Sequence, residues 1–294
     1  MQYTNNSNSI TRDYFDSILL ETRYIDSILP KTEIQLYGKT FQTPIMTAAL
    51  SHLHDICENA MVEFAQGAKD ANAVNFIGMG EDQELENILA VGASTIKIIK
   101  PHFNNDEVFR KIEHAVSNGA FAVGMDIDHA FSNNGTYDVV CGLPMQAKSF
   151  AELSQFIHYA KVPFIVKGVL SIQDAQKSVE AGAKGIIVSH HHGIMDYAIP
   201  PLMILPDIVK AVDGQIPIFV DCGIQSGMDV FKALALGADA VCVGRELMGP
   251  LKNGSAGVTQ RITEMNLELM SVMARTGAKS IKDIDPSVIH YRNF

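Results

Sequence analysis

Residues 216–245, IPIFVDCGIQSGMDVFKALALGADAVCVGR, contain one complete structural unit of this chain. The run 217–223 is short, apolar and rich in β-branched residues, which is typical of a strand buried on both faces. An amphipathic helix is predicted over residues 228–236, and Gly237-Ala238 follows it, where a left-handed helix end favours glycine. A second apolar run, residues 240–245, comes next. This order predicts two neighbouring parallel strands joined by a helix.

The same unit repeats along the chain. A Gly-Ala step precedes an apolar run at residues 92–93, 119–120 and 182–183, and a weaker copy lies at residues 67–68. Helices are predicted between the runs, for instance over residues 106–117, 149–160 and 172–181. The eight predicted strands are residues 44–49, 73–78, 95–100, 121–128, 163–169, 185–189, 217–223 and 240–245. Eight parallel strands alternating with helices predict an α/β fold, a (β/α)8 TIM barrel. The alternative, an open doubly wound sheet, lacks a G-x-G-x-x-G motif after any strand.

The domain organisation follows from this barrel. We expect residues 44–250 to form it, which leaves an extra N-terminal segment of helices and a short strand over residues 1–43. A long C-terminal helix is predicted over residues 259–276, within a helix-and-tail segment, residues 255–294. Because no linker or low-complexity segment interrupts the pattern, residues 1–294 are predicted to form a single domain.

Composition excludes several functional classes. The chain is 47% hydrophobic and 19% charged, so it is not a disordered protein. It has 23 basic and 33 acidic residues, a net charge of −10, which argues against nucleic acid as a partner. No run reaches the roughly 20 apolar residues of a membrane span, and the N-terminus lacks an export signal. The four cysteines form neither a C-x-x-C pair nor a disulfide framework, so we expect a cytoplasmic protein.

The strand ends carry the residues that predict chemistry, because barrels place their active sites at the carboxyl ends of their strands. Gly223 and Gly244 would let a phosphate approach the backbone after the last two strands, and Arg245 adds a bidentate cation. Lys167 interrupts an apolar strand and needs an anionic partner there, while Asp221 ends the seventh strand. Together these residues indicate a phosphorylated cofactor across the barrel top. The glycines as tight turns, and the lysine in a structural ion pair, remain the alternatives.

Four segments carry a family resemblance. GIIVSHHHGIMD (residues 185–196), FIVKGV (164–169), TPIMTAAL (43–50) and the stretch 216–245 resemble the FMN-dependent α-hydroxy-acid oxidases and dehydrogenases. The resemblance spans about residues 30–285 and is most specific after Lys167. It implies FMN as cofactor, a small-molecule substrate oxidised at a CH–OH group, and a homo-oligomer, a tetramer or octamer.

The resemblance also implies the residues that contact FMN. Lys167 would lie beside the flavin's N1/O2 edge, Asp221 would hold the ribityl hydroxyls, and Arg245 would hold the phosphate. Gln225 stands in place of a family arginine, Lys97 in place of a glutamine and Asp126 in place of a threonine. The full predicted set is Ala49, Leu50, Lys97, Asp126, Lys167, Ser189, Asp221, Gly223, Gln225, Gly244 and Arg245.

On the substrate side, His191 matches the family's catalytic base and Asp128 the carboxylate that orients it, a pairing suited to general base chemistry. No metal is implied. However, Ile194 stands where the family has a substrate-binding arginine, and the loop 130–138, AFSNNGTYD, lacks the second one. A carboxylate substrate would lose charge-assisted hydrogen bonds worth about 1.5–3 kcal/mol each. We therefore expect an altered, hydroxy-acid-like substrate.

Other interpretations stay open from the sequence. They are an FMN-dependent isomerase, a phosphate-binding barrel like inosine-monophosphate dehydrogenase, and a flavin-binding protein without catalysis. The histidines at the strand ends also allow a metal site, since neutral imidazoles suit zinc or iron. For His190 and His192, a supporting role in the loop and direct substrate contact are equally compatible with the sequence. The histidines concerned are His52, His54, His129, His190, His191 and His192.

Overall fold

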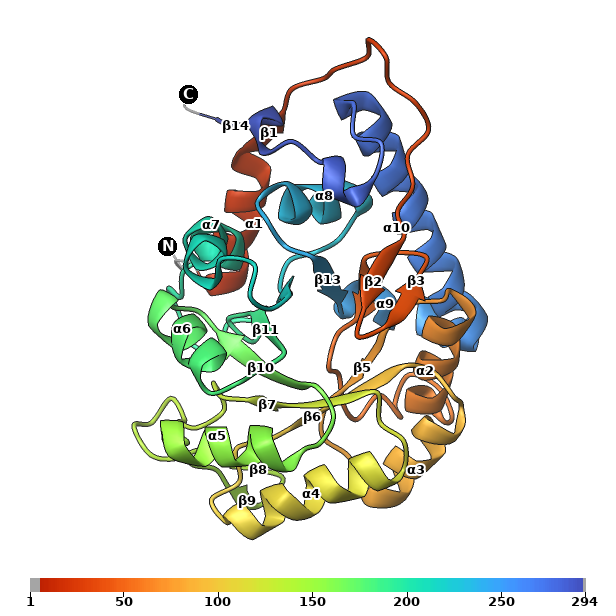
Figure 1. Cartoon of the computed structure of the whole chain (residues 1–294). Helices are drawn as coiled ribbons and strands as arrows, with labels where there is room; N and C mark the ends of the chain where they lie inside the picture. The colour runs from red at the N-terminus through yellow and green to blue at the C-terminus, as the bar shows by residue number, and fades with distance from the viewer. Residues whose placement is uncertain (1–5, 293–294) are drawn as a thin grey trace, which may run out of the picture.

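The computed structural model describes residues 6–292, and its centre is a ring of parallel strands (Figure 1). Residues 1–5 of the predicted N-terminal segment and 293–294 of the predicted tail lie outside the described residues. Within residues 6–292, one sheet contains eight strands in the order β4-β13-β12-β11-β10-β7-β6-β5. They are β4 (Ile45–Thr47), β5 (Asn75–Ile77), β6 (Thr95–Ile99), β7 (Ala122–Asp126), β10 (Phe164–Val169), β11 (Gly185–Val188), β12 (Ile218–Val220) and β13 (Ala240–Val243). All eight predicted strands are confirmed, each shortened by one to four residues in total.

The ring closes between β4 and β5. The Thr47 N–H donates to the carbonyl of Val74 at 3.1 Å, and the Gly78 N–H donates to the carbonyl of Leu50 at 2.8 Å. Leu50 and Ile77 also form an isolated parallel bridge. An open sheet would leave these backbone groups unpaired at two edges, so the prediction of a (β/α)8 barrel is confirmed.

The barrel interior is filled by apolar side chains. Phe76 and Phe219 are buried and meet edge to face, with ring centroids 6.3 Å apart. The hairpin of β2 (Ile34–Leu36) and β3 (Lys39–Phe41) packs Leu36 and Phe41 against this interior cluster. A closed apolar interior leaves the polar strand ends as the place for a site.

Helices surround the strands, as Figure 1 shows. The Ser149 side chain and Glu152 form a reciprocal capping box that fixes the start of α5. The helices predicted over residues 106–117, 149–160, 172–181 and 228–236 begin and end within one residue of the observed ones. The helices are α2 (Ala60–Asp70), α3 (Asp82–Ala90), α4 (Asn105–Ser117), α5 (Phe150–Tyr159), α6 (Ile172–Glu180), α7 (Pro201–Val212), α8 (Gly227–Ala235) and α9 (Arg245–Met248).

The two ends of the chain pack on the barrel. Among the described residues, the N-terminal segment has one helix, α1 (Ser7–Ser17), and three short strands, where we predicted helices and one strand. The first of these, β1 (Ile18–Leu20), pairs antiparallel with β14 (Ile289–Tyr291). The remaining elements are the hairpin β8 (Val139–Val140) and β9 (Leu143–Pro144), and the 3₁₀ turns Pro250–Asn253, Ile281–Asp283 and Pro286–Val288.

The C-terminal helix α10 (Gly254–Thr276) begins five residues before the predicted start. The Glu63 carboxylate accepts a hydrogen bond from the Ser255 N–H at 2.7 Å, and this N–H of the first turn has no partner within the helix. Such a tertiary contact leaves no local pattern in the sequence. None of the described helices is both long and apolar enough to cross a membrane.

Candidate active site

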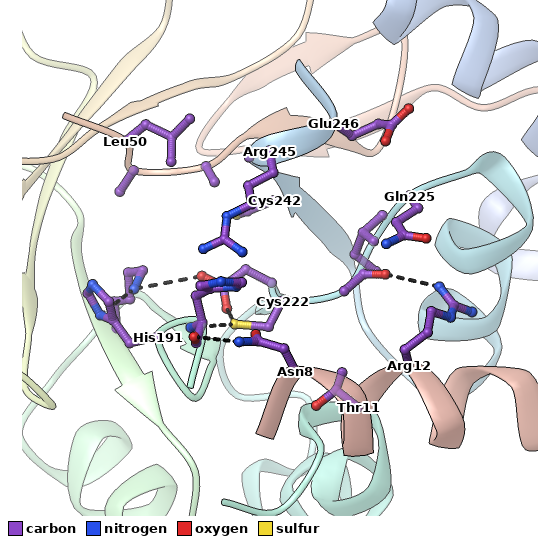
Figure 2. A pocket seen from close by; sticks show the side chains of 18 residues that line it. Asn8, Thr11, Arg12, Leu50, His191, Cys222, Gln225, Cys242, Arg245 and Glu246 are labelled. Carbon is purple, nitrogen blue, oxygen red and sulfur yellow. Dashed lines mark hydrogen bonds and ion pairs between the residues drawn. The ribbon is translucent and has the colours of Figure 1, made fainter. Parts of the chain in front are cut away.

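A cavity of about 390 Å³ opens at the carboxyl ends of the strands, a volume typical of small-molecule sites. Side chains from several strand ends and from α1 surround it in Figure 2. Most of the predicted cofactor ligands line it, together with the predicted base. These are Ala49, Leu50, Lys167, His191, Asp221, Gly223, Gln225, Gly244 and Arg245. The structure therefore gathers residues that lie almost 200 positions apart in the sequence.

One end of the cavity is formed by the turns after β12 and β13. Gly223 has a φ of +87°, and a Cβ there would lie 3.0 Å from both Phe15 and Thr11, so the position requires glycine. The Arg245 side chain extends into the cavity toward Cys222 (Figure 2), and no carboxylate of residues 6–292 pairs with it. Partial burial lowers the pKa of Arg245. An unpaired guanidinium in the same cavity lining as Gly223 suits an anionic group such as phosphate.

Lys167 brings a buried cation to the cavity floor. Its Nζ lies 3.0 Å from Asp126 Oδ1 and 3.7 Å from Asp221 Oδ2. Burial alone would lower the pKa of Lys167, but the carboxylates of Asp126 and Asp221 outweigh burial and raise it. Lys100 is a second cation and donates to Asp126 Oδ2 at 2.7 Å. Burial would raise the pKa of Asp126, and the two ammonium groups outweigh it and lower that pKa. Lys167 and Asp126 are therefore both ionised at neutral pH.

His191 stands on the cavity wall beside this network. Its Nδ1 lies 3.1 and 3.2 Å from the two carboxylate oxygens of Asp128, and 3.2 Å from Lys167 Nζ. The backbone of His191 is left-handed, with φ of +49°, and its N–H donates to Ser189 Oγ at 3.0 Å. The turn and the carboxylate together fix the orientation of the imidazole ring. The structure thus brings the two residues predicted as base and orienting carboxylate into contact, while their catalytic roles stay predictions.

Four predicted site residues lie behind the cavity wall, namely Lys97, Asp126, Asp128 and Ser189. Lys97 is 5% exposed, and its Nζ donates to the carbonyl of Gly78. Burial lowers the pKa of Lys97 to about 8. Asp126 and Ser189 are also buried and act on Lys167 and His191 as described above. Direct contact of these four residues with a ligand therefore stays a prediction.

The sequence did not reveal that α1 forms one wall of the cavity. Asn8 donates through Nδ2 to the carbonyl of His192 at 2.9 Å, and Arg12 pairs with Asp229 at 3.0 Å. Thr11 Oγ1 lies 2.8 Å from His190 Nε2, although the two residues are 179 positions apart. Only a tertiary contact carries this information. In the sequence, only the polar character of this helix could have suggested that it lies beside a polar site.

The histidines after β11 have different roles. His190 is 2% exposed, and its Nδ1 accepts the Gly193 N–H at 2.9 Å while its Nε2 meets Thr11. Both ring nitrogens of His190 are thereby used, which favours a supporting role in the loop. His192 is exposed and lines the cavity. His52 lies in the loop before α2, where its Nε2 is 3.8 Å from Cys141 Sγ.

A metal site was one of the open alternatives. Donor atoms of Asp126, Asp128 and His191 lie within 4.8 Å of one another. The Lys167 ammonium, however, lies 3.0 Å from Asp126 and 3.2 Å from His191. The lysine already supplies a positive charge among these donors, which disfavours a divalent cation at the same point.

Comparison with known proteins gives a consistent result. The sequence pattern of the family described as FMN-dependent dehydrogenase matches residues 2–155 and 144–291 of this chain. The chain is 31% identical over 327 aligned positions to L-lactate oxidase of Lactobacillus jensenii, spanning 100% of this chain and 79% of that protein. It is 39% identical over 160 positions to glycolate oxidase of Spinacia oleracea, spanning 54% of this chain and 43% of that protein.

Solved structures of mandelate oxidase also resemble the chain. A variant with the monooxide FMN adduct has a TM-score of 0.88 and 27% identity, covering 98% of this chain and 91% of that one. A variant with an arginine-to-leucine change, solved with 2-hydroxy-phenylacetamide, has a TM-score of 0.89 and 26% identity, covering 99% and 91%. These matches favour the family indicated by the sequence over the other phosphate-binding barrels.

Proposed function

The chain belongs to the FMN-dependent dehydrogenase family, and we propose that it oxidises the CH–OH group of an uncharged hydroxy-acid derivative, with His191 as the base. That it is an FMN-dependent oxidoreductase acting on CH–OH donors follows from the family. The identity of the base and the charge of the substrate are the proposal. The observation that carries the proposal is the contact between His191 and Asp128 on the wall of the cavity.

The residues of the cavity fit FMN chemically. Arg245, unpaired within residues 6–292, and the glycine turns at Gly223 and Gly244 would hold the phosphate. Asp221, 6% exposed, would accept hydrogen bonds from the ribityl hydroxyls, and the Lys167 ammonium would stabilise negative charge on the reduced ring. Bound FMN supplies the electron sink for the two electrons that leave the substrate.

The protein's part in the reaction is proton handling. His191 would take the hydroxyl proton of the substrate on its ring, and Asp128 would stabilise the resulting imidazolium at 3.1 Å. General base catalysis of this kind contributes about 10²- to 10⁴-fold to a rate. His191→Asn should therefore keep flavin binding and lower flavin reduction by about that factor.

The charge balance around His191 supports an uncharged substrate. Lys100 and Lys167 are both engaged with Asp126, and Ile194 and the loop 130–138 provide no arginine. Near the base, the described residues thus offer no unpaired cation for a carboxylate. The mandelate oxidase variant that lost an arginine was solved with an amide, 2-hydroxy-phenylacetamide. We propose that an amide or ester group takes the place of the carboxylate here.

The test compares matched hydroxy acids and their amides, such as mandelate and mandelamide or lactate and lactamide. The rate of loss of the flavin's visible absorbance is measured without oxygen. We expect the amide to react about tenfold faster or more, because the acid lacks at least one charge-assisted hydrogen bond of about 1.5–3 kcal/mol. Ile194→Arg should raise the rate with the acid and not with the amide.

The results test the charge of the substrate and the catalytic activity separately. If acid and amide react equally fast in the unaltered protein, the uncharged substrate is refuted while the oxidoreductase activity stands. If no compound of either series bleaches the flavin, the catalytic function proposed here is wrong. A protein that keeps its flavin spectrum after Ile194→Arg serves as the control for folding.

We also propose a cytoplasmic homo-oligomer built from one FMN-binding domain. The four cysteines are free of disulfides, which agrees with a reducing compartment. Light scattering coupled to size-exclusion chromatography tests the oligomeric state, and a monomer at micromolar concentration would refute it.

A further inference from the structure

A second histidine–aspartate pair faces the first one. His129 follows β7, and its Nδ1 lies 2.9 Å from Asp138 Oδ2. Its other nitrogen, Nε2, lies 3.0 Å from Nε2 of His191. The two rings are nearly perpendicular, at 82°, with centroids 4.2 Å apart, so the contact runs edge to edge between nitrogens rather than through stacking. Each imidazole therefore has a carboxylate on one nitrogen and the other imidazole on the second.

The number of protons on the pair follows from this geometry. Each Nδ1 faces a carboxylate, Asp138 for His129 and Asp128 for His191. Lys167 Nζ also lies 3.2 Å from Nδ1 of His191, but Asp126 holds this ammonium at 3.0 Å and both oxygens of Asp128 face the same nitrogen, so an N–H donor is favoured at both Nδ1 atoms. If both rings were neutral in that tautomer, two lone pairs would face each other at 3.0 Å and repel. If both carried Nε2–H, two hydrogens would collide. A hydrogen bond between the nitrogens requires one proton there, and hence one positive charge shared by the two rings.

The groups around the two rings can stabilise this positive charge and still allow the proton to leave. Burial, Lys100 and the facing His191 lower the pKa of His129, while Asp138 and Asp126 oppose this. His129 and Asp138 are partly exposed, at 19% and 22% of their side chains, so a proton can pass from this pair to water. The charged groups that face the two rings from the neighbouring elements are Lys100, Asp126, Asp128, Asp138 and Lys167.

We infer that His129 and His191 share one proton in the resting protein, and that His129 relieves His191 of the proton taken from the substrate. The second part rests on the proposed function. When a substrate hydroxyl replaces the contact between the two rings, His129 gives the shared proton to water, so that Nε2 of His191 is free to take the substrate's proton. After the oxidised product leaves, that proton moves from Nε2 of His191 to Nε2 of His129, and Asp138 balances the new imidazolium; one proton thus passes to water in each turnover. No electrons move in this step. His129 acts on the reaction only through His191, so it is a positioning residue. Its ring also occupies Nε2 of His191 until a substrate hydroxyl takes its place.

The first test measures the protonation of the rings directly. Nitrogen NMR of the histidine rings is recorded against pH in the FMN-bound protein without substrate. We expect the two rings to titrate as a coupled pair that holds one proton over a broad range. His129→Leu should shift the pH-dependent change of the His191 ring signals to lower pH, because the hydrogen bond to the charged ring is lost. His129→Gln keeps an acceptor and should restore at least half of that shift.

Two further variants keep this test decisive. Asp138→Asn removes the carboxylate behind His129 without touching either ring, and should move the titration of His191 in the same direction by a smaller amount. His158→Gln, on the exposed face of α5, is the matched control and should leave the His191 ring signals unchanged. If His191 titrates identically in the unaltered protein and in both His129→Leu and Asp138→Asn, the shared proton is refuted.

The second test separates the relay from the base itself. In His129→Leu, flavin reduction in a single turnover should stay within a few-fold of the unaltered rate, whereas steady-state turnover should fall tenfold or more. Added imidazole should restore part of that turnover in His129→Gly. Equal losses in both rates would refute the relay. If no hydroxy compound reduces the flavin of the unaltered protein, the relay fails together with the proposed function, while the NMR result still decides the shared proton.

Discussion

Replacing Lys167 by methionine removes the cation at the centre of the buried network and leaves a side chain of similar length. Lys167 is 4% exposed, and its Nζ lies 3.0 Å from Asp126 and 3.7 Å from Asp221. Both carboxylates are buried and keep their charge only while cations remain near them. The substitution therefore tests whether the strand ends are held together by charge or only by the apolar interior.

The size of the effect follows from what remains after the change. Breaking a buried ion pair by removing one partner costs about 3–5 kcal/mol. Asp126 keeps Lys100 at 2.7 Å, whereas Asp221 loses its ammonium partner. We therefore expect the free energy of unfolding to fall by about 3 kcal/mol at pH 7, near the lower end of that range.

The pH dependence has a definite sign. The pKa of Asp126 is lowered in the folded protein, so its contribution is full above the unfolded pKa of about 3.9 and is lost as the pH falls further. The pKa of Lys167 is raised, so its contribution is full below about pH 10.4 and is lost as the pH rises beyond that. In Lys167→Met, the Asp126 carboxyl will take up a proton at a higher pH. The difference between the two proteins should therefore shrink from pH 7 to about pH 4.5.

Urea unfolding of the flavin-free protein measures this difference, because altered flavin affinity then does not enter the result. Lys177→Met, on the exposed surface of α6, is the matched control and should change stability by no more than about 0.5 kcal/mol. A loss below about 1 kcal/mol for Lys167→Met, or a loss that does not change between pH 7 and 4.5, would show that the network contributes little to folding.

Three other changes test separate parts of the site. Arg245→Met should weaken FMN binding by about 10- to 100-fold, because it removes a charge-assisted hydrogen bond of about 1.5–3 kcal/mol. Flavin fluorescence titration measures the affinity, and an unchanged affinity would contradict this role of Arg245. Gly223→Ala should lower the free energy of unfolding by about 1–3 kcal/mol, because a Cβ at φ +87° would press on Phe15. Thermal unfolding measures this, and unchanged stability would mean that α1 moves aside without cost. Thr11→Val removes the hydrogen bond to His190 at constant shape and should cost about 1 kcal/mol in urea unfolding, with α1 becoming more sensitive to proteolysis.

The fold could be predicted because its signals are local. Each strand is a continuous apolar run followed by a helix, and a left-handed glycine ends four of these helices, α3, α4, α6 and α8, so the repeating unit was visible without any tertiary information. The N-terminal segment was predicted less well, as helices and a single strand. Its β1 forms only by pairing with β14, some 270 residues away, and no local pattern records that pairing.

The partners inside the site depended on strand register. The β6–β7 register places Ile99 opposite Met125, which brings the next pair, Lys100 and Asp126, into contact. The sequence singled out Lys97 instead, through a resemblance that gives a position but no side-chain partner. A shift of one residue between the two strands would have exchanged these neighbours.

By itself, the sequence determined the barrel and the face that carries the chemistry through its repeated local patterns. It indicated the flavin family and the His191–Asp128 pair through short segments that resemble that family. Only the tertiary structure decided that α1 lines the cavity, that Lys100 shares Asp126 with Lys167, and that His129 faces His191 across 3.0 Å. These contacts join elements that no periodicity links. Their energies depend on burial and on distances of a few ångströms, which exist only once the barrel has closed.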